Sequence, residues 1–295
     1  MRKLLTISAN AKINLTLDIL GKRDDDYHEV ELVLQSIALA DTLELTKIDH
    51  GIDFHLDTAQ VAGADSLPTD DSNLAVRAAL LMKERFNLDS GIFIRLIKRI
   101  PIEAGLAGGS TDAAAVIRGI NRLFNLRLNT EEMCDLGAEI GSDVPFCIVG
   151  GTCLATGRGE KLKRLADLPS IPLVLIKPRG SIPTAWAYKT YDSDRSSEHP
   201  DTKQICEAIN LSDTKAVTEL IFNVLERVAI KKYPAINNIK DKLIEAGAMA
   251  AMMSGSGPSI FAITKSNDDS KRIAELFKDS GSQVFVTETV GRLND

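Results

Sequence analysis

The chain of 295 residues has few aromatic residues, no excess of basic residues and no long apolar run. Aromatic residues make up only 5% of it, and acidic residues outnumber basic ones, giving a net charge of −6. This balance argues against a protein that coats nucleic acid, although it leaves room for a local basic patch. No apolar run approaches the ~20 residues of a membrane-spanning helix, so we expect no membrane partner.

Cysteine is scarce and is not arranged in pairs. The four cysteines form no Cys-x-x-Cys motif and the four histidines are scattered, so neither a zinc site nor a disulfide framework is predicted. Reduced thiols used as small apolar side chains are typical of an intracellular protein. Polar residues soon interrupt the N-terminal apolar stretch, which therefore lacks the core of a signal peptide. We expect a cytoplasmic protein.

What the sequence does have is clearest near the N-terminus. Apolar and polar residues alternate strictly from residue 7 to residue 19, which is typical of a half-buried β-strand. The polar face carries Asn10, Lys12 and Asn14. A lysine on such a face is usually solvated, but one set between two short amides is unusual for a solvated surface and marks a candidate functional residue.

Strands and helices follow in an order that suits an α+β sandwich. We expect strands near residues 29–36, 42–48, 52–56, 91–97, 172–177 and 283–290, and on either side of 254–259. We expect helices after a cap at Asp71 or Ser72, at 111–124, from a capping box at Asn129 to 140, within 203–246 and near 269–278. Residues 178–201 are expected to be mostly loop.

A shift in composition after residues 157–160 places a domain boundary near residue 160. The predicted domains are residues 1–160 and 161–295. We allow for the last strand, near 283–290, to pack back on the first domain.

A glycine-rich stretch, Gly105-Leu106-Ala107-Gly108-Gly109-Ser110-Thr111, directly precedes a predicted helix. Glycines let the backbone approach a ligand, and the free N–H groups at a helix start favour an anion such as phosphate. The stretch is not a Walker A loop, because no lysine follows the second glycine group. An ordinary strand-to-helix turn, with Ser110 and Thr111 as caps, remains the alternative.

Two further loops are candidates. Residues 254–259 (Ser-Gly-Ser-Gly-Pro-Ser) lie between two apolar runs and form either a tight hairpin turn or a second backbone anion site. In residues 141–146, Asp143 follows Gly-Ser and precedes Val-Pro. It either satisfies local backbone N–H groups or serves as a carboxylate that accepts a proton or holds a metal.

The few aromatic residues add a third signal. Tyr27 and His28 follow a charged turn, and Trp186 and Tyr188 lie in the stretch expected to be loop. Such residues either fill the core, which is the favoured interpretation for Trp186, or stack on a flat ligand such as a base.

Together, these elements resemble the kinase superfamily named for galactokinase, homoserine kinase, mevalonate kinase and phosphomevalonate kinase. The resemblance rests on the lysine strand, on residues 101–114 (Pro-x-x-x-Gly-Leu-x-Gly-Gly-Ser-Thr-x-Ala-Ala) and on 254–257, and it covers essentially the whole chain. It implies a two-domain α+β fold. An N-terminal ATP-binding domain and a C-terminal ferredoxin-like α/β sandwich would have the active site in the cleft between them.

A narrower resemblance is carried by residues 11–15 (Ala-Lys-Ile-Asn-Leu), by 21–23 (Gly-Lys-Arg) with Tyr27 and His28, and by 104–110 and 141–146. They are similar to the branch that acts in the non-mevalonate isoprenoid pathway. That similarity implies ATP-dependent phosphorylation of the 2-hydroxyl of a diphosphocytidyl methylerythritol. Thr111 departs from the expected serine but keeps the hydroxyl.

The resemblance also implies roles for individual residues. Asp143 would be the catalytic base, and Lys12 would stabilise its anion and the charge that develops on the attacking oxygen. Contacts to the ATP are implied for Pro101, Gly105, Leu106, Ala107, Gly108, Gly109, Ser110, Thr111, Asn73 and Lys98. Contacts to the cytidine-diphosphate substrate are implied for Asn14, Tyr27, His28, Thr184, Tyr188, Gly255, Ser256 and Gly257. Mg²⁺ is expected with ATP; its protein ligands are unknown, with Ser110 the one mild candidate.

Two alternatives stay open at this point. A sister kinase would act on another small alcohol, such as mevalonate or homoserine, and would have no use for the set Tyr27, His28 and Tyr188. A non-catalytic nucleotide-binding module would have no use for Lys12 and Asp143 together. The sequence leaves the oligomeric state open between monomer and homodimer.

Overall fold

The computed structural model describes residues 4–61, 63, 67–194 and 197–292, and the chain divides into two compact units. Unit 1 comprises Met1–Ala11, Leu39–Ile102 and Ala107–Gly150, and unit 2 comprises Lys12–Ala38, Glu103–Leu106 and Gly151–Asp295. Two long strands, β1 (Leu5–Lys22) and β2 (His28–Ile48), contribute residues to both units. The boundary near residue 160 stays a prediction about domains, since the compact units divide the chain differently.

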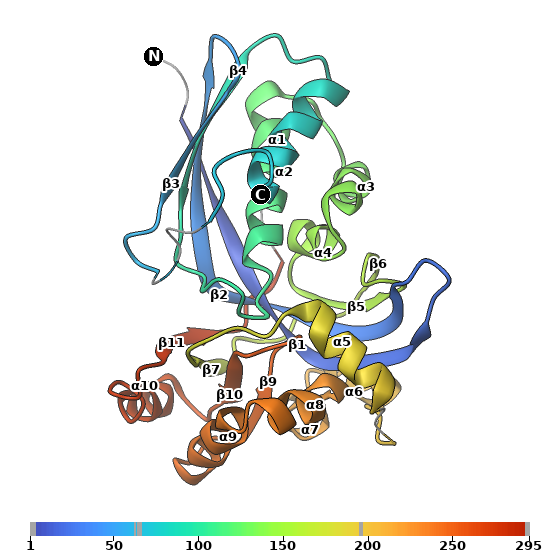
Figure 1. Ribbon diagram of the computed structural model, residues 1–295, viewed down its shortest axis with the longest axis vertical. Helices are drawn as coiled ribbons and strands as arrows, with labels where there is room; N and C mark the ends of the chain where they lie inside the picture. Colours follow the sequence, from blue (N-terminus) through green and yellow to red (C-terminus); the bar gives the residue numbers. More distant parts are fainter. Residues whose placement is uncertain (1–3, 62, 64–66, 195–196, 293–295) are drawn as a thin grey trace. The chain divides into compact units, whose positions relative to one another are not determined.

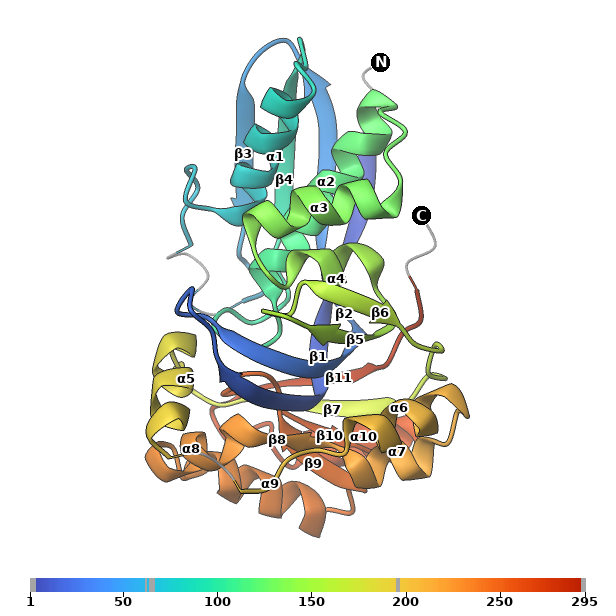
Figure 2. The ribbon, with the colours of Figure 1, turned by 90° about the vertical axis from the view of Figure 1, so that its right-hand side faces the viewer.

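Unit 1 is a sheet covered on one face by helices (Figures 1 and 2). Its strands lie in the order β3–β4–β2–β1, with β3 (Ile52–Asp57) parallel and β2 antiparallel to β4 (Gly91–Ile97). The helices are α1 (Leu74–Arg85), α2 (Gly108–Phe124), α3 (Thr130–Ile140) and α4 (Val144–Val149). The middle of α2 is fully buried because alanines there allow close packing against the sheet and α1. The capping box of Asn129 and Glu132 is confirmed.

In the part of β1 that belongs to unit 2, the side chains on both faces of the strand are buried from Lys12 to Ile19. The predicted apolar face is buried from Ile7 to Ile19. The polar face is exposed at Ser8 but buried at Lys12, Asn14, Thr16 and Asp18. Burying such groups costs free energy unless they are bonded, so this face has a purpose other than solvation.

The second sheet of unit 2 has the ferredoxin-like order. Its strands β7 (Pro172–Lys177), β9 (Ala250–Met253), β10 (Ile260–Ile263) and β11 (Gln283–Glu288) are all antiparallel to their neighbours and lie in the order β11–β7–β10–β9. Helices α9 (Ala235–Glu245) and α10 (Asn267–Glu275) pack on this sheet (Figure 1). The predicted C-terminal sandwich is therefore confirmed.

The remaining elements of unit 2 extend the sheet that contains β1 and β2. β5 (Thr152–Thr156) pairs with β2 and with β6 (Lys161–Arg164), and the two-residue β8 (Phe222–Asn223) runs parallel to β1. Further helices of this unit are α6 (Thr202–Asn210), α7 (Thr214–Leu220) and α8 (Val224–Lys232). None of the helices in the described part of the chain is long and apolar enough to cross a membrane.

Several expectations about local structure were wrong. Residues 29–48 form one strand rather than two, because residues 37–41 contain no glycine or proline to make a turn. Part of the stretch expected to be loop forms α5 (Thr184–Ser193), which starts after Pro183 and buries only Ala187 and Tyr191. Helix α2 begins at Gly108, three residues before the predicted start, so the glycines belong to its first turn.

Candidate active site

The buried polar face of β1 is organised around Lys12. Its Nζ donates hydrogen bonds to Asn14 Oδ1 at 2.7 Å and to the carbonyl oxygen of Gly105 at 3.2 Å. The backbone N–H of Lys12 donates to the carbonyl of Leu106 at 3.2 Å. The lysine strand and the first part of the glycine-rich loop, predicted separately from the sequence, are thus in direct contact in unit 2.

The loop 254–257 meets the same carbonyl. Ser254 Oγ, fully buried, donates to Gly105 O at 3.0 Å. Gly105 has a φ of +75°, and a Cβ there would lie 2.2 Å from the carbonyl oxygen of Ser254, so only glycine permits this approach. A Cβ at Gly255 would lie 3.3 Å from both Lys12 Nζ and Asn14 Oδ1. Three predicted elements therefore converge within unit 2.

A buried asparagine holds the loop in place. Asn223 donates from Nδ2 to the carbonyls of Met253 at 2.9 Å and Gly255 at 2.8 Å, while its Oδ1 accepts from Leu225 N at the start of α8. At the other end of the loop, the hydroxyls of Thr184 and Ser256 are 3.0 Å apart, next to Gly257. Sequence reasoning missed Asn223; the signal for it was a polar residue directly before an apolar helical pattern.

The rest of the glycine-rich loop forms the start of α2 in unit 1. Pro101 and Leu106 are buried, and Ala107, with a φ of 57°, precedes the helix in the left-handed conformation. The first N–H group that bonds within the helix is that of Thr111, to Ala107 O, so the preceding N–H groups face the helix end without an intrahelical acceptor. These donors and the helix dipole favour an anion. The Thr111 hydroxyl is already used, since it donates to Asn10 O at 2.7 Å.

Lys98 is buried beneath this helix start. Its Nζ bonds Asp41 Oδ2 at 2.5 Å and Asp112 Oδ2 at 2.8 Å, and all three side chains are at most 4% exposed. Burial alone would lower the pKa of Lys98, but the carboxylates of Asp112 and Asp41 outweigh it and raise that pKa. Burial raises the pKa of Asp112 well above its usual range. Sequence reasoning missed both aspartates; for Asp112 alone, an acidic residue inside an alanine-rich helix was a usable signal.

Asn73 caps α1 instead of the predicted Asp71 or Ser72. Its Oδ1 accepts from Ala75 N at 2.9 Å, and its Nδ2 donates to Pro68 O at 2.8 Å. The predicted contact between Asn73 and a nucleotide stays a prediction.

Asp143 lies at the N-cap position of the short helix α4, and its side chain makes no capping hydrogen bond there. It is half-buried, and Val144 to Val149 behind it are buried. The carboxylate is therefore not consumed by the local turn, which was the alternative interpretation. Asp143 belongs to unit 1 and Lys12 to unit 2, so their partnership stays a prediction.

Two of the aromatic residues predicted to bind cytosine, His28 on β2 and Tyr188 on α5, lie side by side. The rings of His28 and Tyr188 have their centroids 5.0 Å apart, and His28 Nε2 lies 2.9 Å from Asp192 Oδ1, one helical turn after Tyr188. Tyr27 is 53% exposed and has the Arg158 guanidinium 5.0 Å from its ring centroid. Asp192, which orients His28, was not predicted because its stretch was expected to be loop.

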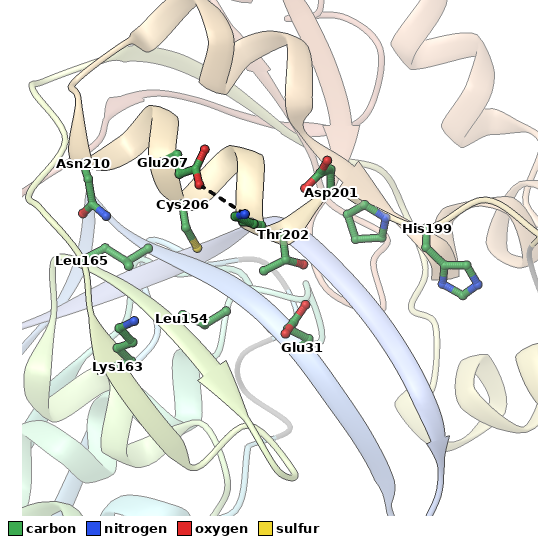
Figure 3. A pocket seen from close by; sticks show the side chains of 12 residues that line it. Glu31, Leu154, Lys163, Leu165, His199, Asp201, Thr202, Cys206, Glu207 and Asn210 are labelled. Carbon is green, nitrogen blue, oxygen red and sulfur yellow. Dashed lines mark ion pairs between the residues drawn. The ribbon is translucent and has the colours of Figure 1, made fainter.

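A separate cavity of about 720 Å³ lies in unit 2 among β2, β5, β6 and α6 (Figure 3). Glu31, Lys163 and Cys206 are among the residues that line it, and none of the predicted site residues does. Within the described residues, no group of three or more His, Cys, Asp or Glu side chains is placed to hold a metal ion. The predicted chemistry therefore rests on the clusters described above.

Comparisons with known proteins agree with this geometry. The family model described as "GHMP kinases N terminal domain" matches residues 73–151, and "GHMP kinases C terminal" matches residues 203–283. A protein of Acetivibrio thermocellus named 4-diphosphocytidyl-2-C-methyl-D-erythritol kinase is 45% identical, over 97% of this chain and 99% of its own. A protein of Bacillus pumilus with the same name is 46% identical, over 97% of each chain.

Solved structures extend the comparison. A crystal structure of 4-(cytidine 5'-diphospho)-2C-methyl-D-erythritol kinase is similar with a TM-score of 0.83 and 30% identity, over 97% of this chain and all of the other. Homoserine kinase from Cytophaga hutchinsonii has a TM-score of 0.76 at 19% identity, over 99% and 96% of the two chains, and so shows the fold alone. The two matched domains and the full-length relatives show that the chain belongs to the GHMP kinase family.

Proposed function

We propose that this chain transfers the γ-phosphoryl group of ATP to the 2-hydroxyl of 4-diphosphocytidyl-2-C-methyl-D-erythritol, releasing ADP. The observation that supports this best is the buried cluster at the carbonyl of Gly105, to which Lys12 and Ser254 donate hydrogen bonds while Asn14 accepts one from the Lys12 ammonium. Three motifs from distant parts of the sequence build one buried polar cluster there, in a chain whose full-length relatives carry the name of that kinase.

The ATP phosphates are assigned to the start of α2. Phosphoryl transfer depends mainly on positioning and on stabilising charge on the transferred group, which backbone N–H donors at a helix start can do. Gly109 is exposed at this start, and a Cβ there would meet only Leu74, at 3.5 Å. The fold therefore does not need a glycine at this position, whereas a phosphate lying against the helix end does.

The reaction then needs a base and a cation. Asp143 accepts the proton of the 2-hydroxyl while the oxygen of that hydroxyl bonds the γ-phosphorus and the bond from the γ-phosphorus to the ADP oxygen breaks. The Lys12 ammonium stabilises the developing negative charge on the attacking oxygen, and Asn14 keeps that ammonium oriented through its 2.7 Å bond. Mg²⁺, when bound with ATP, neutralises phosphate charge; the hydroxyl of Ser110 is the protein group offered to it.

The cytidine end of the substrate is assigned to β2 and α5. Tyr27 and Tyr188 stack on the cytosine, and His28, held by Asp192, reads its edge. The hydroxyls of Thr184 and Ser256 are offered to the diphosphate. A mevalonate or homoserine kinase would leave this set unused, which is why the cytidine substrate is preferred. The cytoplasmic location and the monomeric or dimeric state stay predictions.

Substitution of Asp143 tests the assigned base. Asp143→Ala should lower kcat by about a thousandfold or more, because no other group is assigned to accept the hydroxyl proton. ATP affinity, measured by calorimetry, should change little, since the phosphates are assigned to α2. Near-normal turnover in this variant would remove Asp143 from the mechanism.

A further inference from the structure

The ion cluster of Asp41, Lys98 and Asp112 is a buried charged group in unit 1 that the proposed chemistry does not use directly. It joins three elements: Asp41 lies in β2, Lys98 directly follows β4, and Asp112 lies in α2. Removing one partner of such a buried cluster leaves an uncompensated charge, so the cluster fixes these elements relative to one another.

Asp41 holds more than the lysine. While its Oδ2 accepts from Lys98 Nζ, its Oδ1 accepts from the backbone N–H groups of Arg99 at 2.5 Å and Ile100 at 2.8 Å. One carboxylate therefore satisfies the ammonium and two consecutive amides, and it fixes the segment that leads from β4 toward the glycine-rich loop.

That fixed segment abuts the first residue of α2. A Cβ on Gly108 would lie 3.2 Å from Ile100 Cγ2 and 3.4 Å from Lys98 Nζ. One helical turn further on, Asp112 Oδ2 accepts from the same Nζ. The first turn of α2 thus lies close to the segment Lys98–Ile100 at Gly108 and is tied to it by a charged hydrogen bond at Asp112.

We infer that Asp41 and Asp112 are positioning residues for nucleotide binding, which act through Lys98 to hold the first turn of α2 in place for the ATP phosphates. The inference rests on the proposed function, because that function assigns the phosphates to this turn. Helix N–H donors bind an anion well only when they are already oriented, so loosening the turn weakens ATP binding without removing a catalytic group. Lys98 then acts from beneath the turn rather than by touching the nucleotide.

Asp112 has a further property that sharpens the test. Two carboxylates and one ammonium leave the buried cluster one negative charge in excess when all are ionised. Burial raises the pKa of Asp112, and its Oδ1 is buried without a hydrogen-bond partner among the described residues. Lys98 and Asp41 are the charged groups that act on this carboxyl. A neutral amide at position 112 can still accept the bond from Lys98, whereas a methyl group cannot.

The experiment compares Asp41→Asn, Asp112→Ala and Asp112→Asn with the unmodified protein. Asp41→Asn leaves one acceptor oxygen where Lys98 and the backbone N–H groups of Arg99 and Ile100 together use two. Asp112→Ala removes the acceptor altogether, so both variants should raise the ATP KM and the calorimetric Kd for ATP about tenfold. kcat at saturating ATP should stay within about threefold, and the KM of the alcohol should not change. Asp112→Asn should restore the ATP KM to near the unmodified value.

Lys83→Met is the matched control for lost stability in the same unit. Lys83 Nζ donates to the carbonyls of Leu88 at 2.9 Å and Ser90 at 3.1 Å, away from α2's first turn. It should lower the melting temperature without changing ATP affinity. If Asp41→Asn and Asp112→Ala melt earlier but bind ATP normally, or if Asp112→Asn is as impaired as Asp112→Ala, the inference is overturned.

Two readouts keep this inference separate from the proposed function. Calorimetric ATP binding, measured without any alcohol, tests the positioning role. Turnover of the cytidine alcohol by the unmodified protein tests the function. If Asp41→Asn does not fold, the Asp112→Ala and Asp112→Asn pair decides the question alone.

Discussion

Gly109 is a glycine that packing within the protein does not require, so a ligand is the remaining reason for it. It lies in the first turn of α2, is exposed, and has room for a Cβ on the protein side. Gly119, in the middle of the same helix, is the opposite case, because a Cβ there would lie 2.9 Å from Ile7 Cδ1 and 3.0 Å from Leu45 Cδ2. Packing within the protein therefore requires a glycine at position 119 but not at position 109.

Gly109→Ala should raise the ATP KM about tenfold while leaving the free energy of unfolding unchanged or higher by about 0.5 kcal/mol, because alanine is the better helix residue. Gly119→Ala should lower the free energy of unfolding by about 1–3 kcal/mol through overpacking and leave the ATP KM unchanged. Urea unfolding and ATP titration measure both quantities. An unchanged ATP KM in Gly109→Ala would contradict phosphate binding at this turn.

The carboxyl of Asp112 makes stability depend on pH in a stated direction. Its pKa in the folded protein is raised by burial above the ordinary value of 3.8. Below that ordinary value both states carry the proton and the full stability is present. As the pH rises, the unfolded chain releases the proton first, so stability falls until the pH passes the folded pKa.

Asp112→Asn cannot release this proton and should not show the fall. The free energy of unfolding of the variant minus that of the unmodified protein should therefore increase as the pH rises above the ordinary carboxyl pKa of about 4. Urea titrations at several pH values measure this difference. A difference that stays constant with pH would show that Asp112 titrates normally.

At the residue scale, the sequence predicts residues that a repeated pattern marks and misses those that only burial reveals. Lys12 was identified because it lies between two asparagines on the polar face of a strictly alternating strand, and the structure buries it with Asn14. Asp41 lies where neither periodicity nor a motif distinguishes it, and Asn223 is marked only as a polar residue before an apolar helical pattern. Their importance arises from the backbone groups that other segments bring to them, at positions fixed only by the tertiary fold.

Helix α5 carries the proposed specificity for cytidine. Tyr188 and Asp192 are one turn apart on the helix and both reach His28 on β2. Trp186 lies on the same helix but contacts Tyr233, at 6.0 Å between ring centroids, and so belongs to a different cluster. Helix α5 thus carries Tyr188, which is assigned to the substrate, and Trp186, which is not and can serve as a control.

Tyr188→Leu should raise the KM of the cytidine alcohol by about ten- to a hundredfold, because stacking of a base on an aromatic ring contributes about 1–3 kcal/mol. The ATP KM should not change. Trp186→Leu should leave both KM values near those of the unmodified protein. Steady-state kinetics with each substrate varied in turn distinguish the two variants, and equal effects at both positions would contradict the assignment.

Elements were predictable where one face of a segment is buried with a regular period. The alternation in β1 and the capping box of α3 are local properties, and the structure has both. α5 was missed because only two of its residues are buried, which leaves too narrow an apolar stripe to distinguish helix from loop. The single long β2 was missed because its pairing partners change along its length, from β5 to β4.

At the scale of the whole molecule, an acidic chain is proposed to bind two polyanions. The net charge of the chain is −6, so its overall charge repels these anionic ligands and does not attract them. The cations concerned are instead buried and bonded: Lys12 with Asn14, and Lys98 with two carboxylates. Binding rests on oriented backbone N–H groups and local charge, which is consistent with glycine-rich loops in a chain of ordinary glycine content.

The family was predictable from the sequence because its motifs occur in a fixed order, and full-length relatives confirm it. The substrate is the central claim, and a panel of alcohols tests it most directly. The purified protein is incubated with ATP, Mg²⁺ and either 4-diphosphocytidyl-2-C-methyl-D-erythritol, mevalonate or homoserine, and ADP and the phosphorylated product are quantified. With the cytidine alcohol, we expect one ADP to form for each molecule of phosphorylated product. With mevalonate or homoserine, we expect no more ADP than the background. Equal or greater turnover of mevalonate or homoserine, or none of the cytidine alcohol, would contradict this claim.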